Sequence, residues 1–532
     1  MSNNLAGIPG TRVHADVDTL FDAYCELHFP VGNTRSTNKH NSGSISETFP
    51  ANFRDNEILK MLQLCAAVPC EFENESVLMY SFVLTSEDSH WRFCFCRHDF
   101  KAKYIMVILT RLPWHDAFVN ILATLADLKA QNSTEFSVFR MNCYKAPVPN
   151  RGEITLVPVG TDRKVFSLEQ PSFYKLPTIP ENHNLTIFHN FATPNIMLSI
   201  IVSLIFERRI IITSRYPDRH SACVQAANTL LYPMEWQHTY IPILPAQLSD
   251  YLSGSMPFLI GVPLFVLETI CRGELGDVII FNCDAGTYES CYNDVQLLPK
   301  RVLADMQKKF RNTQEMSDEY ISYVFLLMMV HLIGQYRDGI KFKYGTPFFC
   351  EFAFLSKCHP TKRPFLRRFL PTPMCVHFIN TRLGMLKQES MIWDRFEMES
   401  ALHSQRKNKS CWAPSKKKYK KTDEIYAPRN SLQNHLLNAI EVTESIKLQL
   451  KDLRKSREYK NAKAHTDVRE LFESIRHLLA FAISAYRGLQ AQNEEEMNNL
   501  GYTEISTRTR TSEPSKQDKG RTTKPSSNRP FG

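Results

Sequence analysis

The hydrophobic positions of this chain follow two periods, and the change between them divides the sequence into regions. Apolar or alternating runs at residues 19–29, 77–84, 91–97 and 104–110 predict strands, with Cys94 and Cys96 on one face of the third. The segment 115–128 then places apolar side chains at helical spacing. Several strands followed by an amphipathic helix predict a small α+β lobe over residues 14–146, with a mobile polar loop at 32–46.

The pattern changes after a proline-rich stretch. Six prolines between positions 146 and 184 predict a linker over residues 147–185. Beyond it, predicted helices (194–206, 220–231 and 248–251) alternate with predicted strands (209–213, 238–244, 258–262 and 278–282). Apolar strands that alternate with helices predict an α/β lobe over residues 186–298, with a mostly parallel sheet covered on both faces.

The remainder of the chain is helical and then polar. Helical periodicity predicts a helical subdomain over residues 299–400, packed on that sheet. A basic linker over 401–429 and two amphipathic helices within 430–492 should follow it. The composition of residues 493–532, rich in Ser, Thr, Arg, Lys and Pro, predicts a disordered tail.

Composition and charge narrow the class of protein. A chain of 532 residues with 43% hydrophobic residues should form two or three folded units. The polar first 18 residues contain no secretory signal, and the longest apolar runs, 196–206 and 323–333, fall short of the roughly 20 residues that span a bilayer. The 14 cysteines have no paired spacing, so we expect a cytoplasmic protein with reduced thiols and no transmembrane segment.

The sequence offers no convincing catalytic, metal or cofactor site. It lacks phosphate-binding glycine loops, the HExxH motif and zinc-ligand spacing. Cys358 to Arg363 has the spacing C-x4-R, whereas a cysteine phosphatase loop needs C-x5-R, so a loop cysteine is the better interpretation. His189, His220 and His238 are isolated, and each is expected to be an ordinary core or surface histidine.

A phosphoester hydrolase is one function to weigh, and it depends on residues 282–287. These follow a strand like the D-x-D loop of hydrolases that form an aspartyl phosphate, but Asn282 replaces the nucleophile. An amide cannot perform that attack, so a turn is the better interpretation of Asp284 to Thr287.

The ordered segments resemble the DENN-domain family, and most closely its connecdenn branch. The most specific segment is 230–262, which reads LLYPMEWQHTYIPILPAQLSDYLSGSMPFLIGV. Residues 278–284 (VIIFNCD) replace an acidic V-x-x-D-L-D-like strand of the family, with Asn282 as a mild departure. Further similar segments lie at 20–30, 92–97, 108–128, 188–215, 323–337 and 352–382. The resemblance thus covers about residues 20–387, over two thirds of the chain.

The resemblance implies a bilobed, tripartite DENN module: a longin-like lobe, then an α/β sheet lobe with a helical extension. It implies guanine-nucleotide exchange on a Rab GTPase, of the Rab thirty-five type, in clathrin-mediated endocytosis and endosomal recycling. The protein would then associate peripherally with clathrin-coated vesicles, the plasma membrane and early or recycling endosomes. Because exchange makes and breaks no covalent bond, it needs neither a catalytic residue nor a cofactor.

An exchange factor must instead hold the switch segments of the GTPase away from the bound nucleotide, which requires a broad binding surface. We expect part of that surface on loops at the carboxyl edge of the α/β sheet. The first lobe should contribute the start of its helix, although Trp114 and Phe118 also suit a core and Arg215 also suits a solvated loop. The predicted GTPase contacts are Trp114, His115, Phe118, Ser214, Arg215, Pro245, Asp250 and Gly261.

A basic cluster suggests a second kind of partner. Eight Lys or Arg residues lie within positions 406–421, and such a cluster attracts anionic phosphoinositide membranes. A plain solvated linker is the alternative, and no motif supports nucleic-acid binding. The predicted membrane contacts are Lys416, Lys417, Lys418, Lys420 and Lys421.

A non-catalytic adaptor that links a Rab GTPase to endocytic membrane, with clathrin adaptor machinery as a possible partner, is the alternative function. The tail contains no DPF or FxDxF peptide of the kind that recruits a clathrin adaptor. That absence weakens coat binding more than it weakens exchange.

Overall fold

A computed structural model describes residues 12–14, 17–28, 44–66, 77–131, 134–150, 153–160, 165–170, 175–176, 182–311, 317–343, 346–387 and 394–410. The predicted amphipathic helices, the predicted disordered tail and the cluster of Lys416, Lys417, Lys418, Lys420 and Lys421 lie outside these residues.

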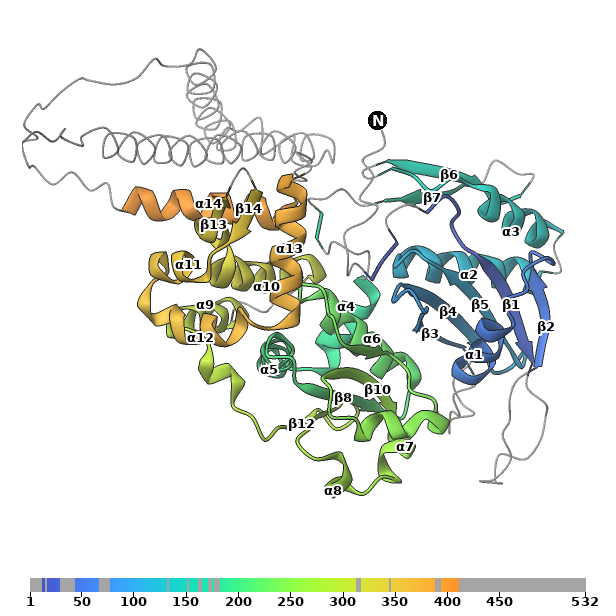
Figure 1. Cartoon of the computed structure of the whole chain (residues 1–532). Coiled ribbons are helices and arrows are strands. Elements are labelled where there is room, and N and C mark those ends of the chain that lie inside the picture. The colour runs from blue at the N-terminus through green and yellow to red at the C-terminus, as the bar shows by residue number, and fades with distance from the viewer. Residues whose placement is uncertain are drawn as a thin grey trace, which may run out of the picture. The chain divides into compact units, whose positions relative to one another are not determined.

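The first lobe contains a five-stranded antiparallel sheet in the order β2-β1-β5-β4-β3 (Figure 1). Helix α1 covers one face, where Cys94 and Cys96 pack beside Leu62, and helices α2 and α3 cover the other. The elements are β1 (Ala23–His28), β2 (Ser44–Phe49), α1 (Asn56–Ala66), β3 (Val77–Thr85), β4 (Trp91–Asp99), β5 (Tyr104–Thr110), α2 (His115–Ala130) and α3 (Glu135–Lys145).

The four predicted strands and the helix that follows them are confirmed as β1, β3, β4, β5 and α2. The shared face of Cys94 and Cys96 is confirmed as well, because both thiols belong to the core beneath α1. Helices α1 and α3 were missed. Strand β2 was also missed, and it begins at Ser44, inside the loop predicted for residues 32–46.

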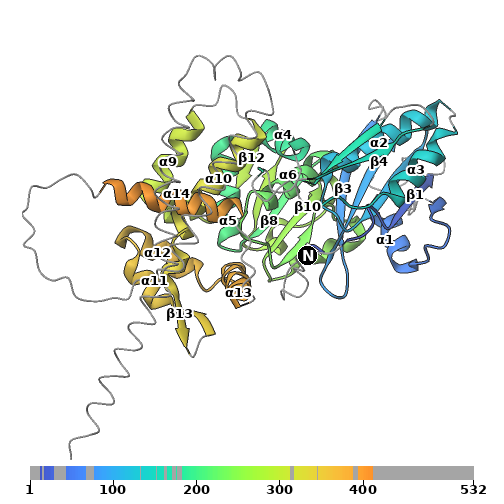
Figure 2. The same ribbon diagram turned by 90° about the horizontal axis from the view of Figure 1, so that it is seen from above.

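The second lobe contains a five-stranded sheet in the order β12-β11-β8-β10-β9 (Figure 2). All neighbours are parallel except β12, which pairs with β11 in the antiparallel sense, so the mostly parallel sheet is confirmed. Its strands are β8 (Arg209–Ser214), β9 (Thr239–Ile241), β10 (Phe258–Pro263), β11 (Ile279–Asn282) and β12 (Thr287–Glu289).

Helices cover both faces of this second sheet. Ile210 and Ile212 of β8 point into the core shared with α5 and α6, while Ile211 points to the opposite core, where η1 and α7 pack. Pro194 begins α5, where the Thr193 hydroxyl caps the helix by accepting from the backbone N–H of Ile196. The helices are α4 (Asn182–Phe191), α5 (Pro194–Ile205), α6 (Pro217–Thr229), η1 (Ala246–Ser253), α7 (Leu264–Glu268) and α8 (Arg272–Leu275).

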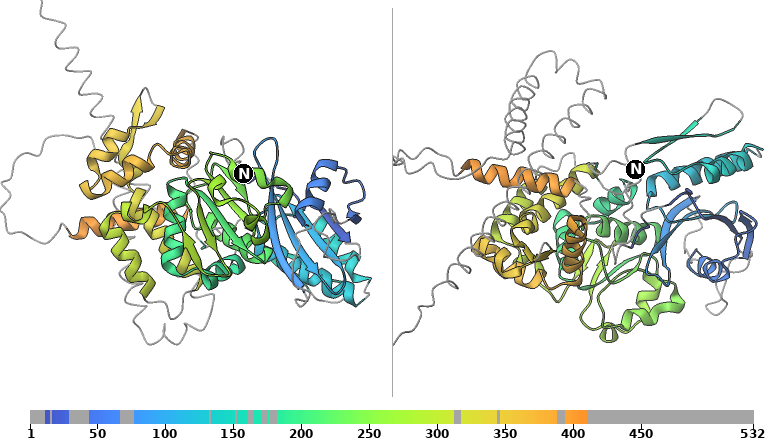
Figure 3. Two further views of the ribbon diagram at one scale, coloured as in Figure 1. Left: turned by 90° about the horizontal axis from the view of Figure 1, so that it is seen from below. Right: turned by 45° about the horizontal axis from the view of Figure 1, so that its top comes forward.

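Helices predominate after residue 298, as predicted (Figure 3). The most apolar of them, α10, buries most of its side chains. The helices are η2 (Asp294–Leu297), α9 (Lys300–Arg311), α10 (Asp318–Ile333), η4 (Tyr336–Gly339), α11 (Glu351–Lys357), η5 (Pro360–Lys362), α12 (Arg363–Phe369), α13 (Pro373–Lys387) and α14 (Arg395–Ser410).

Three details differ from the sequence prediction. An antiparallel pair, β6 (Ile154–Pro158) and β7 (Val165–Glu169), lies inside the predicted linker of residues 147–185. A second pair, β13 (Ile340–Lys343) and β14 (Thr346–Phe349), interrupts the helical region. Helix α14 continues to Ser410, into the predicted basic linker, because its first turns are anchored by buried Phe396 and Glu397.

The edge strand β3 of the first sheet packs against α6 of the second lobe. The Ser81 carbonyl accepts from the Ser221 hydroxyl, and Gln225 Nε2 donates to the Ser81 hydroxyl over 2.7 Å. Trp91 of β4 stacks on Tyr240 of β9, with ring centroids 4.6 Å apart. Buried polar bonds and an aromatic stack therefore hold the two lobes together.

Within the described residues, no single helix is long and apolar enough to cross a bilayer. Helices α4 and α5 meet the length and composition criteria only when they are taken together, and the pair is bent by 113°.

Candidate functional site

Three segments meet at the carboxyl edge of the second sheet. Strand β8 ends at Ser214, α6 begins at Pro217, and Asp284 lies in the turn between β11 and β12. The Asp284 carboxylate accepts from the Ser214 hydroxyl at 2.9 Å and from the backbone N–H of Arg215 at 2.7 Å. One carboxylate thus fixes the direction in which the chain leaves β8.

The same carboxylate orients Arg219 of α6. Arg219 Nη1 lies 2.8 Å from Asp284 Oδ1, and the guanidinium carbon lies 3.9 Å from the centre of the Tyr216 ring. Phe191 of α4 approaches the guanidinium as well, at 4.8 Å. An ion pair and two cation–π contacts therefore restrict this side chain. The exposed Arg215 stands beside it, so the edge presents a preorganised basic surface, which we call the Asp284 edge: Ser214, Arg215, Tyr216, Arg219 and Asp284.

The hydrogen bonds around Asn282 argue against a phosphate-transfer site. Asn282 Oδ1 accepts from the backbone N–H groups of Asp284 and Ala285, at 2.9 and 3.1 Å. This pattern closes the turn between β11 and β12, which supports the interpretation of the sequence as a turn. Because Asp284 is already held by Ser214, Arg215 and Arg219, neither residue is available as a nucleophile.

The other candidate catalytic residues are structural. Cys358 is buried, and its carbonyl accepts from Arg363 Nε at 3.2 Å, so the run does not form an open loop of backbone amides. His220 lies entirely within the protein, where burial lowers its pKa to about 4. In the described part of the chain, no three His, Cys, Asp or Glu side chains converge on a position that could hold a metal ion.

His238 has a partner that the sequence could not indicate. Its Nε2 lies 3.1 Å from Glu207 Oε2, although the two residues lie on different loops, and the other oxygen of Glu207 accepts from the backbone N–H of Met374 at 2.9 Å. Glu207 has a φ of 53°, a left-handed conformation that is rare for this residue type. The pair links the start of α13 to the sheet lobe, which is a structural role.

The structure corrects the contact role predicted for the first lobe. Trp114 and Phe118 are 4% and 0% exposed, and Phe118 stacks on Phe95. His115 is buried too, and its Nδ1 lies 3.1 Å from the side-chain amide of Asn184 on α4. Buried side chains offer no surface to a GTPase, so these three residues support α2 from within.

The five predicted contacts of the second lobe do not form one cluster. Arg215 is exposed at the carboxyl edge, and the buried Ser214 beside it acts through Asp284. Pro245 is buried, and Gly261 faces the Pro242 carbonyl too closely for any side chain. Asp250 is exposed on η1, two residues before Leu252, whose carbonyl accepts from Arg209 at the start of β8, the opposite edge of the sheet.

Sequence analysis missed three residues of the Asp284 edge: Tyr216, Arg219 and Asp284. The parallel pairing of β8 with β11 brings Asp284 to Arg215 across 69 positions of sequence. The only signal in the sequence was that both residues follow predicted strands, whose carboxyl ends share an edge in a parallel sheet.

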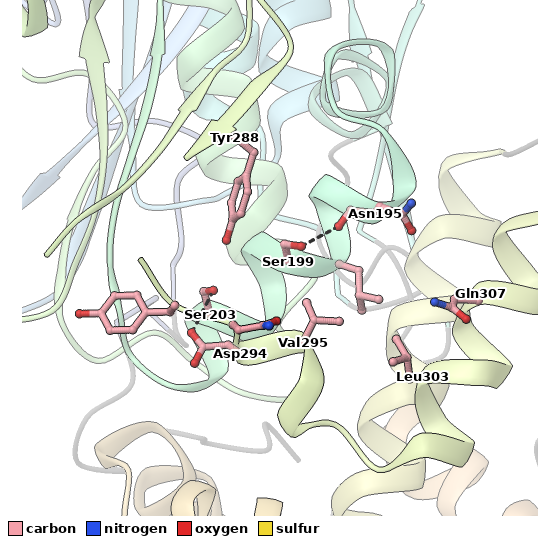
Figure 4. Close-up of a pocket in the computed structure, with 11 residues that line it drawn as sticks. Asn195, Ser199, Ser203, Tyr288, Asp294, Val295, Leu303 and Gln307 are labelled. Atoms are coloured by element: carbon pink, nitrogen blue, oxygen red, sulfur yellow. Dashed lines mark hydrogen bonds between the residues drawn. The ribbon is translucent and has the colours of Figure 1, made fainter. Parts of the chain in front are cut away.

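A cavity of about 320 Å³ lies between α5, η2 and α9 (Figure 4). Its acidic group, Asp294, is neutralised by Arg208, which donates from Nε and Nη2 at 3.1 and 2.9 Å, and Ser203 donates to the same carboxylate. The remaining lining is uncharged and includes Asn195, Ser199, Gln307 and the apolar Leu198 and Val295. Amides, hydroxyls and a neutralised carboxylate provide no acid–base pair for catalysis.

Comparison with known proteins finds a matching domain model and several similar proteins. Residues 101–286 match the DENN (AEX-3) domain. The chain is 32% identical to human DENN domain-containing protein 1A over 399 residues, and 34% identical to mouse DENN domain-containing protein 1B over 356 residues. These alignments cover 73% and 66% of this chain but only 38% and 46% of the relatives.

A more distant relative, human DENN domain-containing protein 2B, is 25% identical over 340 residues, which are 59% of this chain and 29% of that protein. The chain thus spans less than half the length of the relatives it matches. The higher identity to proteins 1A and 1B agrees with the resemblance to the connecdenn branch. The family model and these identities show that the chain contains a DENN domain, with residues 101–286 as its matched part.

Proposed function

We propose that this protein is a guanine-nucleotide exchange factor that promotes release of GDP from a Rab GTPase, of the Rab thirty-five type. The observation that carries the proposal is the similarity to DENN domain-containing proteins 1A and 1B over about two thirds of the chain or more. A binding surface is sufficient for this activity, because nucleotide exchange needs no acid–base or metal chemistry from the exchange factor. The proposed setting is clathrin-mediated endocytosis and endosomal recycling.

The proposed mechanism is a linkage between two binding equilibria. An exchange factor that binds the nucleotide-free GTPase more tightly than the loaded form lowers the nucleotide affinity by the same factor. Its surface must therefore favour a switch conformation that cannot hold magnesium and phosphate. A preorganised surface suits this task, because little binding free energy is then lost in ordering side chains.

The Asp284 edge is the part of the surface that we assign to the GTPase. Arg215 is exposed there, and Asp284 holds its backbone, while Arg219 is fixed by an ion pair and two rings. Asp250 on η1 remains a second proposed contact. We place the longin-like lobe at residues 14–146 and the α/β lobe with its helical extension at 186–400.

The test is a GDP-release assay on the full chain. A panel of Rab GTPases is loaded with fluorescent GDP, and release is followed with and without catalytic amounts of protein. We expect acceleration on one or a few Rabs, with the Rab thirty-five type among them. If no Rab responds to folded protein, the exchange proposal fails.

A pair of matched variants locates the surface. Arg215→Glu reverses an exposed charge at the Asp284 edge, and Lys60→Glu reverses an exposed charge on α1. We expect Arg215→Glu to slow exchange by roughly tenfold or more, since removal of a contact at an interface hot spot costs at least about 2 kcal/mol. Lys60→Glu should leave the rate unchanged. If both variants had the same exchange rate, the GTPase would have to bind at a surface other than the Asp284 edge.

The alternative is a non-catalytic adaptor that binds a Rab GTPase and endocytic membrane without exchange. The same assay distinguishes the two, because an adaptor would bind the GTPase in a pull-down and leave GDP release unchanged. The predicted lysine cluster at residues 416–421 would serve membrane attachment in either case.

A further inference from the structure

The pair of strands β13 and β14 has one largely exposed face, on which only Lys341 is half-buried. In the antiparallel register, Lys341 lies opposite Phe348 and Lys343 lies opposite Thr346, so these four side chains share a face. The ribbon extends beyond α11 and α12 (Figure 2). Phe348 is 42% exposed although it is a large aromatic residue.

The opposite face of the ribbon is packed against the protein. The rings of Phe349 and Phe354 lie 5.6 Å apart, and a Cβ at Gly339 would meet both of them within 3 Å. Phe352, which follows the ribbon at the start of α11, is 83% exposed, the highest value among the exposed large hydrophobic side chains of the described chain. The fold thus buries the neighbouring Phe354 while it leaves Phe348 and Phe352 in solvent.

Positive charge surrounds these two aromatic side chains. Residues 341–368 contain seven Lys or Arg and a single acidic residue, Glu351, whereas the whole chain has a net charge of only +9. Four of these cations are exposed: Lys343, Lys357, Arg367 and Arg368. The region therefore combines exposed aromatic rings with a local positive field.

We propose that this ribbon face, formed by Lys341, Lys343 and Phe348, docks together with Phe352 of α11 on the surface of an anionic lipid bilayer. Aromatic rings partition into the boundary between headgroups and acyl chains, while lysines approach the lipid phosphates. A projecting ribbon fits a flat, deformable membrane better than a protein partner, which would need a complementary groove and more than about 1,000 Å² of buried area. This surface lies among the described residues and is a different stretch of sequence from the lysine cluster at residues 416–421.

The test is sedimentation of the full chain with vesicles of phosphatidylcholine alone or with 30% phosphatidylserine added. The contribution of the lysine cluster is removed first by changing all five of its lysines to Gln, which removes their charge without adding a repulsive one. In that background, each of the variants Phe348→Ser, Phe352→Ser, Lys341→Glu and Lys343→Glu is compared with the background protein. Ile154→Ser, at a residue that is 59% exposed on β6, is the matched control for loss of an exposed apolar side chain.

We expect the background protein to bind the anionic vesicles and not the neutral ones. Each lysine reversal should lower the partition coefficient by about fivefold or more, and Ile154→Ser should leave it unchanged. Phe352→Ser should weaken binding even at high salt, where charge is screened. Circular dichroism confirms that each variant is folded. The proposal would be overturned if the background protein did not bind the anionic vesicles. It would also be overturned if the four variants bound them as well as the background protein does.

Discussion

Arg219 Nη1 lies 2.8 Å from Asp284 Oδ1, and this ion pair joins the start of α6 to the turn between β11 and β12. Both side chains are only partly exposed, at 26% and 20%. The pair lies at the edge of the sheet to which we assign the GTPase, and Asp284 supports the backbone of Arg215 there too. The carboxylate is therefore a positioning residue for the proposed exchange surface.

Asp284→Asn should reduce exchange more than it reduces stability. The amide retains the size of the side chain but loses the charge that holds Arg219, so we expect a loss of about 1–2 kcal/mol in the free energy of unfolding. Arg219 should lose its fixed position, and exchange should slow several-fold. Glu289→Gln is the control, because Glu289 is 64% exposed and 3.8 Å from Arg272, and such surface pairs contribute about 0–1 kcal/mol. Exchange at the wild-type rate in folded Asp284→Asn would remove Asp284 from the site.

The contact between the lobes should depend on Gln225. Its side-chain amide donates to the Ser81 hydroxyl at 2.7 Å within a buried interface, so Gln225→Ala removes a buried hydrogen bond between α6 and β3. We expect a loss of about 1–3 kcal/mol in urea unfolding. In a double-mutant cycle with Ser81→Ala, the coupling energy should be about 0.5–1.5 kcal/mol. Asn380→Ala, at an exposed position on α13, should change the unfolding free energy by less than about 0.5 kcal/mol. If the two losses of unfolding free energy were simply additive, the hydrogen bond between Gln225 and Ser81 would not stabilise the contact between the lobes.

Local patterns predicted the elements whose side chains are mostly apolar and buried, and they failed where contacts between distant parts of the chain determine the structure. The apolar runs of β5 and α5 were sufficient to identify them. Strand β2, by contrast, has only Ile45 and Phe49 as apolar residues and owes its conformation to pairing with β1. Trp114 and Phe118 carry the composition of a binding surface, but packing on β4 buries them. The position of Arg215 could be predicted because the residue follows a predicted strand closely. Its contact with Asp284 could not, because that contact depends on which strands are neighbours in the sheet.

Gly261 should tolerate no side chain. A Cβ built there would lie 2.0 Å from the Pro242 carbonyl oxygen and 2.9 Å from His220 Cδ2, in the middle of the central sheet. Gly261→Ala should therefore destabilise the protein by several kcal/mol or prevent folding, because backbone atoms cannot yield as a flexible side chain would. Gly384→Ala on α13 is the matched control, since nothing lies within 4 Å of its Cβ position. That variant should be neutral or more stable by up to about 1 kcal/mol. Thermal unfolding of the two variants measures the difference. Similar melting temperatures would contradict the close approach of Gly261 to the Pro242 carbonyl.

Mild acid should destabilise the protein through two histidines, the buried His220 and the half-buried His98. Burial lowers the pKa of His220 and of His98 to about 4, whereas the unfolded chain takes up a proton near the ordinary value of 6.5. Between these values the unfolded state binds more protons, so stability falls as the pH decreases from 6.5 towards 4. From pH 7 to pH 5 we expect a loss of about 2 kcal/mol for each histidine.

Urea unfolding at several pH values between 7 and 5 measures this loss. His220→Gln should flatten the dependence on pH, whatever its effect on stability at pH 7, because the group that takes up the proton is gone. His28→Gln, at an exposed position at the end of β1, is the control. If His220→Gln retained the full pH dependence of the wild-type chain, the lowered pKa of His220 could not be its source, and the remaining slope would have to come from His98 or from other groups.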